Sequence, residues 1–121
     1  AKNTELAKKF FTQGNLIHKA KFHTGDAVQI LSELDEQFDI ILIDLDKEQY
    51  PKALEVAKTK LKLGGLMIAD NLLWFGRVLE KNGDASTQSI KKFSQTLFND
   101  CSFISTLLPV RDGVGVAYKI K

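Results

Sequence analysis

The sequence predicts an α/β protein with a doubly wound, mostly parallel sheet that ends in an antiparallel hairpin. Segments with helical spacing of apolar residues alternate with the short apolar runs 38–44 and 66–70, which are typical of strands buried on both faces. Two further apolar runs near the C-terminus flank Asp112 and Gly113, a dipeptide that favours a hairpin turn. Strands that alternate with helices form parallel sheets with right-handed crossovers.

The N-terminal part of the chain is predicted to contain two helices and one strand. A helix is expected over residues 3–13, because its apolar residues fall on one side and Gly14 can end it. Residues 20–25 are expected to form a short strand that ends at a glycine. The second helix is expected over residues 26–37, with Asp26 at its start.

The rest of the chain continues the alternation. Residues 38–44 are predicted to form a buried strand, 49–62 a helix that two glycines end, and 66–70 the next buried strand. Residues 84–100 are predicted to form an amphipathic helix before the terminal hairpin. Phenylalanines with helical spacing are expected in the core, namely Phe10, Phe11, Phe93 and Phe98.

Composition limits the possible functions. A chain of 121 residues forms one domain at most. Lys and Arg together number 17 against 15 for Asp and Glu, and a net charge of +2 argues against a nucleic-acid partner. Cys101 is the only cysteine, which excludes an internal disulfide and fits a reducing, cytoplasmic compartment. No apolar run approaches the roughly 20 residues that span a bilayer, so no membrane partner is expected.

Polar side chains follow the predicted strands at the point where each strand ends. Asp26, Asp44 and Asp70 come after three successive strands, and ligands of open parallel sheets bind just past the carboxyl ends of the strands. With Asn71, the carboxylates of Asp44 and Asp70 offer the hard oxygen ligands that suit Mg²⁺. Lys47 lies three residues after Asp44, so its amine could reach the same place and act as a base.

Each of these residues also has a simpler interpretation when it is taken alone. An Asp after a strand often caps the next helix or stays solvated. A single Trp, here Trp74, usually belongs to the core or an interface, and a single lysine such as Lys47 is more often a surface residue. His18 and His23 lack metal-ligand spacing and are interpreted as structural. The two acidic segments at the ends of consecutive buried strands favour a shared site.

Three segments of the chain form a longer pattern: IDLDKEQY (43–50), IADNLLW (68–74) and LPVRDGVGVAYK (108–119). They resemble the Asp-x-Asp-Lys-x-x-Tyr segment, the Asp-Asn-x-x-Trp segment and the terminal hairpin of cation-dependent S-adenosylmethionine O-methyltransferases. That family includes catechol and caffeoyl-CoA O-methyltransferases. The resemblance covers essentially the whole chain. It implies a Rossmann-like sheet and identifies residues 1–121 as the C-terminal part of a single methyltransferase domain.

The resemblance also implies roles for individual residues near the strand ends. Asp44, Asp70 and Asn71 would hold the metal, and Lys47 would be the catalytic base or an orienting charge. A divalent cation bound by two adjacent hydroxyls lowers their pKa and fixes their direction. Mg²⁺ is the cation expected here, with Mn²⁺ and Ca²⁺ as alternatives.

Further residues are implied to contact the cofactor and the acceptor. Trp74 and Arg77 would shape the acceptor pocket, together with the loop 76–86. The acceptor implied by the resemblance is a catechol-like aromatic with adjacent hydroxyls, although a coenzyme A thioester, a flavonoid or another vicinal diol would use the same ligands. A homodimer is what the family suggests. The residues expected along S-adenosylmethionine are Gly25, Asp26, Ala27, Asp44 and Tyr50.

The family's first two strands and its glycine-rich loop have no counterpart in this sequence. In the family's sheet these strands lie between segments 20–25 and 38–44, so we expect an open apolar edge on 38–44, which favours association. The chain alone is therefore expected neither to bind the cofactor normally nor to turn over, unless another segment completes the sheet.

Two other functions are compatible with such a fold. A phosphorelay receiver domain also places an Asp, here Asp44, at the end of a buried strand. It needs an acidic pair after its first strand and a Lys-Pro near its last, whereas Pro109 follows Leu108 and no such pair precedes Asp26. A non-catalytic binding or assembly module of the same fold is the second alternative, because fold alone does not fix function.

Overall fold

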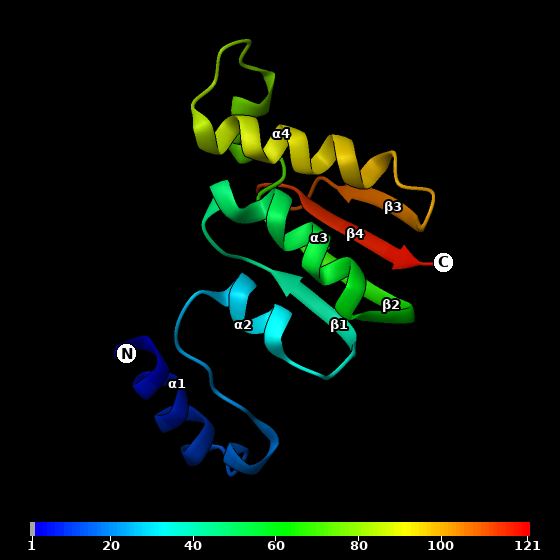
Figure 1. Cartoon of the computed structure of the whole chain (residues 1–121). Helices are drawn as coiled ribbons and strands as arrows, with labels where there is room; N and C mark the ends of the chain where they lie inside the picture. Colours follow the sequence, from blue (N-terminus) through cyan, green and yellow to red (C-terminus); the bar gives the residue numbers. More distant parts are fainter. Residues whose placement is uncertain (1) are drawn as a thin grey trace.

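The computed structural model describes residues 2–121 and has α/β architecture (Figure 1). Helices α3 and α4 lie side by side on one face of a four-stranded sheet, and α1 lies apart near the N-terminus (Figure 1). No helix in this described range is long and apolar enough to cross a membrane. In chain order the elements are α1 (Lys2–Gln13), η1 (Ile17–Lys19), α2 (Ala27–Glu33), β1 (Phe38–Ile43), η2 (Lys47–Gln49), α3 (Tyr50–Lys60), β2 (Leu61–Ala69), η3 (Trp74–Leu79), α4 (Ala85–Phe98), β3 (Phe103–Leu108) and β4 (Val114–Lys119).

The sheet joins one parallel pair to the predicted antiparallel hairpin. Its strand order is β1-β2-β4-β3, with β1 parallel to β2 and with β4 antiparallel to both β2 and β3. Ile43 pairs with Ala69 at the carboxyl ends of β1 and β2. The residues that follow these strands therefore lie next to each other, which is the arrangement that the sequence predicted for Asp44 and Asp70.

The core lies between the sheet and helices α3 and α4. Tyr50 and Phe93 are both fully buried, and their rings meet edge to face with centroids 5.2 Å apart. Leu61 and Met67 of β2 are buried beneath the same helices. Tyr50 is the first residue of α3. Its packing against Phe93 therefore holds the start of this helix close to the carboxyl ends of β1 and β2.

Several predicted elements differ from the structure. The helix predicted over residues 26–37 spans only Ala27–Glu33, and the helix predicted over 49–62 ends at Lys60, before the two glycines that were expected to end it. Residues 20–25 form no strand, because within residues 2–121 no neighbouring strand offers them a hydrogen-bonding partner. β2 begins at Leu61 instead of 66, so Gly64 and Gly65 lie inside the strand. Gly65 is needed there because a Cβ atom would stand 3.0 Å from the carbonyl oxygen of Asp39 on β1.

The prediction that all four phenylalanines lie in the core is only partly right. Phe93 is buried, whereas Phe10 is 60% exposed, and Phe11 and Phe98 also keep substantial exposed surface. Helix α1 has no buried residue and packs mainly against η1. Its apolar side is therefore only partly covered, with the ring of Phe11 resting edge to face on Phe22 at 5.3 Å.

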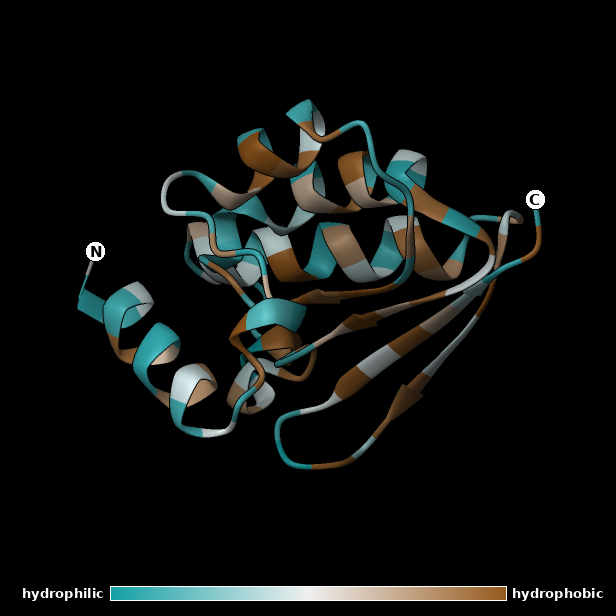
Figure 2. Ribbon diagram, turned by 90° about the horizontal axis from the view of Figure 1, so that it is seen from below, coloured by the Kyte–Doolittle hydropathy of each residue, from teal (hydrophilic) through white to brown (hydrophobic). Residues whose placement is uncertain are grey.

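The expectation that segment 38–44 is buried on both faces is wrong for this chain. Ile41 and Ile43 point into the core, but Ile40 and Leu42 are 60% and 64% exposed. Figure 2 shows the reason: α3 and α4 cover one face of the sheet, and no helix of the described range 2–121 lies directly against the other face. β1 is also an edge strand, so the predicted open apolar edge is present.

Asp84 caps the N-terminus of α4, and the pKa of its carboxyl group can be tested. Oδ1 of Asp84 accepts bonds from the Thr87 hydroxyl at 2.7 Å and the Thr87 amide at 2.9 Å, and Oδ2 accepts from Arg77 at 2.8 Å. These bonds, those from Thr87 first, lower the pKa of Asp84 from 3.8 to about 2.

Because the folded pKa of Asp84 is below the unfolded one, this cap stabilises the fold fully above pH 3.8 and loses its contribution as the pH falls through about 2. An NMR titration of the Asp84 carboxyl is expected to show a midpoint near 2. Thr87→Val is expected to raise that midpoint more than Arg77→Gln does. A midpoint at or above the ordinary value in the unsubstituted chain would contradict this account.

Candidate active site at the strand ends

Three predicted metal ligands lie at the carboxyl ends of β1 and β2. Asp44 follows β1, and Asp70 and Asn71 follow β2. The amide of Asp70 donates to the carbonyl oxygen of Ile43 at 3.1 Å, which fixes the ends of the two strands to each other. Oδ1 of Asp70 accepts from the backbone amide of Asn71 at 2.8 Å. The short-range geometry of the rim therefore comes from the parallel pairing of β1 and β2.

Tyr50 lies beneath this rim and connects its parts. The Tyr50 hydroxyl donates to the carbonyl oxygen of Asp70 at 2.8 Å, with the carbonyl oxygen of Ile43 at 3.3 Å. Nζ of Lys47 donates to the same hydroxyl at 2.7 Å and lies 3.5 Å from Oδ1 of Asp44. Burial and the negative charges of Asp44 and Asp70 raise the pKa of Tyr50 well above its usual range. Its hydroxyl thus stays protonated and serves as a structural donor.

The placement of Tyr50 and Lys47 refines their predicted roles. Lys47 is only 8% exposed, so the interpretation as an ordinary surface lysine is wrong. Tyr50 has no exposed surface, and this burial argues against the predicted direct contact with the cofactor. Its hydroxyl instead accepts from Nζ of Lys47 and so fixes where the Lys47 amine lies.

The hairpin loop between β3 and β4 supplies residues that the sequence analysis did not assign. Oδ2 of Asp112 accepts from Nδ2 of Asn71 at 3.3 Å, and Oδ1 accepts from the amide of Phe75 at 2.6 Å. The amides of Leu72 and Leu73 donate to the carbonyl oxygens of Gly113 and Asp112, both at 2.9 Å. The predicted turn at Asp112-Gly113 was the available signal, because β4 pairs with β2 and brings this turn to the end of β2.

An open cleft of about 640 Å³ lies between these two loops. Five of its lining residues belong to the segment after Asn71, and two come from the hairpin loop. Several backbone positions here have a left-handed φ, which is uncommon outside glycine and clusters at functional sites: Asn71, Trp74, Phe75, Gly76, Arg111 and Gly113. The cleft is lined by Asn71, Leu73, Phe75, Gly76, Val78, Leu79, Arg111 and Asp112.

The two residues predicted for the acceptor pocket stand beside this cleft and do not line it. Trp74 packs against the core, and its Nε1 is buried without a hydrogen-bond partner in the part of the chain described. Arg77 makes ion pairs with Asp84 at 2.8 Å and Glu80 at 3.4 Å, which raise its pKa. Its charge is therefore already compensated within η3 and the start of α4.

The donor chemistry of the rim fits a hard divalent cation. Residues 2–121 contain no group of three or more His, Cys, Asp or Glu side chains that could hold a metal ion. The predicted set is different in kind, with the carboxylates of Asp44 and Asp70 and the amide of Asn71. Nδ2 of Asn71 donates to Asp112, which orients the amide so that Oδ1 of Asn71 can serve as a metal ligand. Such a set suits Mg²⁺, which keeps several water ligands.

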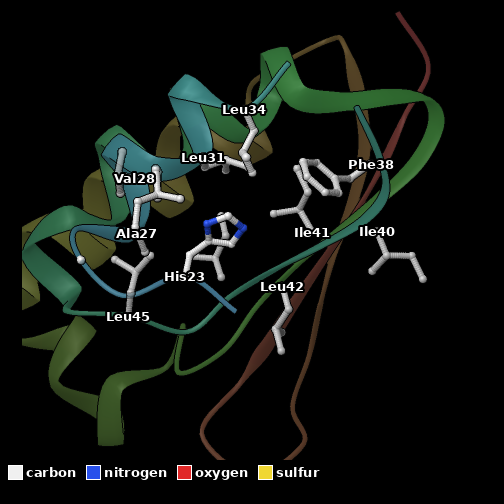
Figure 3. Close-up of a pocket in the computed structure, with 14 residues that line it drawn as sticks. His23, Ala27, Val28, Leu31, Leu34, Phe38, Ile40, Ile41, Leu42 and Leu45 are labelled. Atoms are coloured by element: carbon white, nitrogen blue, oxygen red, sulfur yellow. The ribbon is translucent and has the colours of Figure 1, made fainter. Parts of the chain in front are cut away.

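The predicted cofactor residues Gly25, Asp26 and Ala27 lie at the start of α2, beside a second, apolar cavity. Asp26 caps α2, because its Oδ1 accepts from the amide of Gln29 at 2.8 Å. Gly25 and Ala27 line a cavity of about 340 Å³ between α2 and β1. Figure 3 shows Leu31 and Leu34 on one side of this cavity and Phe38 on the other. The cavity thus lies beside the edge of β1 that no other strand of residues 2–121 pairs with.

Gly113 is expected to be intolerant of substitution, because it has a φ of +81° and a Cβ atom would stand 2.5 Å from Cγ of Leu73. Gly113→Ala is expected to lower the free energy of unfolding by about 3 kcal/mol, through clash and backbone strain together. Gly76→Ala is the matched control, since Gly76 has a φ of +80° and nothing within 4 Å of such a Cβ. It is expected to cost only about 1 kcal/mol. Equal losses in urea denaturation would contradict the close approach of the two loops.

Comparison with known proteins agrees with this architecture. A model of the O-methyltransferase family matches residues 1–120. A probable caffeoyl-CoA O-methyltransferase 1 from Dictyostelium discoideum is 29% identical, over 97% of this chain and 54% of its own length. A catechol O-methyltransferase from Niastella koreensis is 30% identical, over 88% of this chain and 51% of its own length.

A solved structure gives the same result for the fold. The crystal structure of an O-methyltransferase from Bacillus cereus in complex with SAH matches with a TM-score of 0.88 at 27% identity, over 98% of this chain and 58% of that chain. This chain spans about half the length of the curated relatives that it matches. The predicted fold class is thus confirmed, and the chain belongs to the O-methyltransferase family.

Proposed function

We propose that this chain carries the metal and acceptor half of an S-adenosylmethionine-dependent O-methyltransferase that acts on aromatic acceptors with adjacent hydroxyls. One observation carries the proposal. Asp44, Asp70 and Asn71 lie together at the ends of two paired parallel strands, with the buried amine of Lys47 3.5 Å from Asp44. A structural role alone would not require two carboxylates and a buried amine at the same rim.

The reaction assigns a task to each of these groups. The acceptor oxygen attacks the methyl carbon, the carbon–sulfur bond breaks, and the sulfonium becomes a neutral thioether while the hydroxyl proton leaves. A bound divalent cation would lower the pKa of the acceptor hydroxyl. The amine of Lys47 is held in place by its hydrogen bond to Tyr50. It can therefore either stabilise the negative charge that develops on the acceptor oxygen or accept the hydroxyl proton. Alignment of the oxygen with the methyl carbon supplies much of the remaining rate.

Cofactor binding in this proposal needs a further segment of the whole protein. Gly25 and Ala27 border the apolar cavity beside β1, and the edge of β1 is unpaired within residues 2–121. The relatives are about twice as long as the matched region. We propose that the remaining segment fills this cavity, pairs with β1 and completes the cofactor site.

The test uses the full-length protein that contains this chain. It is incubated with S-adenosylmethionine and catechol, with Mg²⁺ or with a chelator, and methylated product is measured. Methylation that requires Mg²⁺ is expected. Methylation that persists unchanged in the chelator would remove the metal from the proposal, and absence of both methylation and cofactor binding would favour the assembly-module alternative.

A further inference from the structure

The cleft beside Asn71 contains one basic side chain that makes no ion pair within residues 2–121. Among the residues that line it, Arg111 is the only Lys or Arg. No ion pair or hydrogen bond involves the Arg111 side chain anywhere within residues 2–121. Arg77 differs, because Asp84 and Glu80 already pair with it. Arg111 is therefore the positive charge that a ligand in this cleft would meet.

The neighbouring acid, Asp112, points its carboxylate at the other loop and does not contact the Arg111 guanidinium. Within residues 2–121 Asp112 makes no ion pair with Arg111; its Oδ1 accepts from the amide of Phe75 at 2.6 Å and its Oδ2 from Nδ2 of Asn71 at 3.3 Å. Asp112 thus joins the two loops, and the guanidinium of Arg111 has no bonded partner in the described part of the chain. Arg111 also adopts a φ of +52°, a conformation that residues with a Cβ atom rarely take.

The rest of the cleft suits an aromatic ring. Leu73, Phe75, Val78 and Leu79 provide apolar surface, and aromatic rings pack favourably against such side chains. Asn71, a proposed metal ligand, lines the same cleft. An acceptor whose hydroxyls lie at Asn71 could therefore place its ring on the apolar residues and its far side toward Arg111.

We propose that Arg111 selects acceptors that carry a carboxylate on the aromatic ring, such as a dihydroxybenzoate, over neutral catechols. This inference rests on the proposed function and names its substrate class. A guanidinium binds a carboxylate through two parallel hydrogen bonds, and such charge-assisted pairs are stronger than neutral ones. The preference is set by the hairpin loop, which lies outside the metal ligands.

The test compares acceptors that differ only in charge. The full-length protein is assayed with 3,4-dihydroxybenzoate and with its neutral methyl ester, in the unsubstituted form and as Arg111→Gln and Arg111→Gly. The unsubstituted protein is expected to favour the carboxylate. Arg111→Gln is expected to lower kcat/KM for the carboxylate about 10- to 100-fold, mainly through KM, with little change for the ester.

Arg111→Gly separates specificity from folding. Glycine takes a φ of +52° without strain, so this variant is expected to be at least as stable as the unsubstituted protein and still to lose the preference for the carboxylate. Lys92→Gln, an exposed lysine of α4, serves as the charge control and is expected to change neither acceptor. An equal fall for both acceptors, or no preference in the unsubstituted protein, would overturn the inference.

Failure of the proposed function is distinguishable from failure of this inference. If the unsubstituted protein methylates neither acceptor, binding of the acid and of its ester is measured by calorimetry. Tighter binding of the acid that Arg111→Gly abolishes would support the anion site without methyl transfer. Equal binding of acid and ester would overturn it.

Discussion

Replacing Asp70 by asparagine is expected to lower the rate of Mg²⁺-dependent methyl transfer by about two to three orders of magnitude, because a cation that polarises the acceptor contributes several kcal/mol to transition-state stabilisation. In the unsubstituted chain Oδ1 of Asp70 accepts from the amide of Asn71 at 2.8 Å, and the asparagine side chain keeps an oxygen that can accept the same bond. It removes the negative charge. The fold should therefore persist while the affinity for the cation falls, which is measured by the Mg²⁺ dependence of kcat/KM in the full-length protein.

Asp39→Asn provides the matched control for Asp70→Asn. Asp39 lies in β1, far along the strand from the rim, and pairs with Lys62 at an exposed surface. The same chemical change there is expected to leave the Mg²⁺ dependence unaltered. If Asp39→Asn lowered activity as much as Asp70→Asn, the loss would not come from the rim and the proposed ligand set would be wrong.

Replacing Phe93 by alanine is expected to lower the free energy of unfolding by about 3–5 kcal/mol. Phe93 is fully buried and supports Tyr50, whose hydroxyl connects Lys47 to the carbonyl oxygen of Asp70. The cavity left behind would remove packing from the layer directly beneath the rim. Urea denaturation followed by circular dichroism measures the loss.

Phe98→Ala is the control for this prediction. Phe98 lies on the same helix, α4, but is 40% exposed. The same truncation is expected to cost about 1 kcal/mol, because less apolar surface is lost. A similar cost at both positions would indicate that α4 does not pack as described.

The rim could be predicted from the sequence because it depends on local rules. Asp44 and Asp70 each follow a run of apolar residues, and parallel pairing brings such positions together without further information. The burial of Phe93 followed in the same way from helical spacing. In each case the pattern and its partner lie within this chain.

The features that the sequence did not predict depend on contacts with distant or absent partners. Residues 20–25 have the composition of a strand, but no strand within residues 2–121 pairs with them. Ile40 and Leu42 were predicted to be buried, yet no helix within residues 2–121 covers their face of the sheet. The contact of Asp112 with Asn71 joins positions 41 residues apart, and only the pairing of β4 with β2 brings them together.

The central claim is that Asp44, Asp70 and Asn71 form a divalent-cation site, and paramagnetic NMR of this chain tests it without relying on activity. Mn²⁺ is added to the ¹⁵N-labelled chain, and Mg²⁺ is then added as a competitor. We predict that Mn²⁺ first broadens the amide signals of these residues and of Asp112, that Mg²⁺ restores them, and that Asp70→Asn abolishes the effect. Broadening that spreads evenly over exposed carboxylates such as Asp39, with no preference for the rim, would contradict the claim.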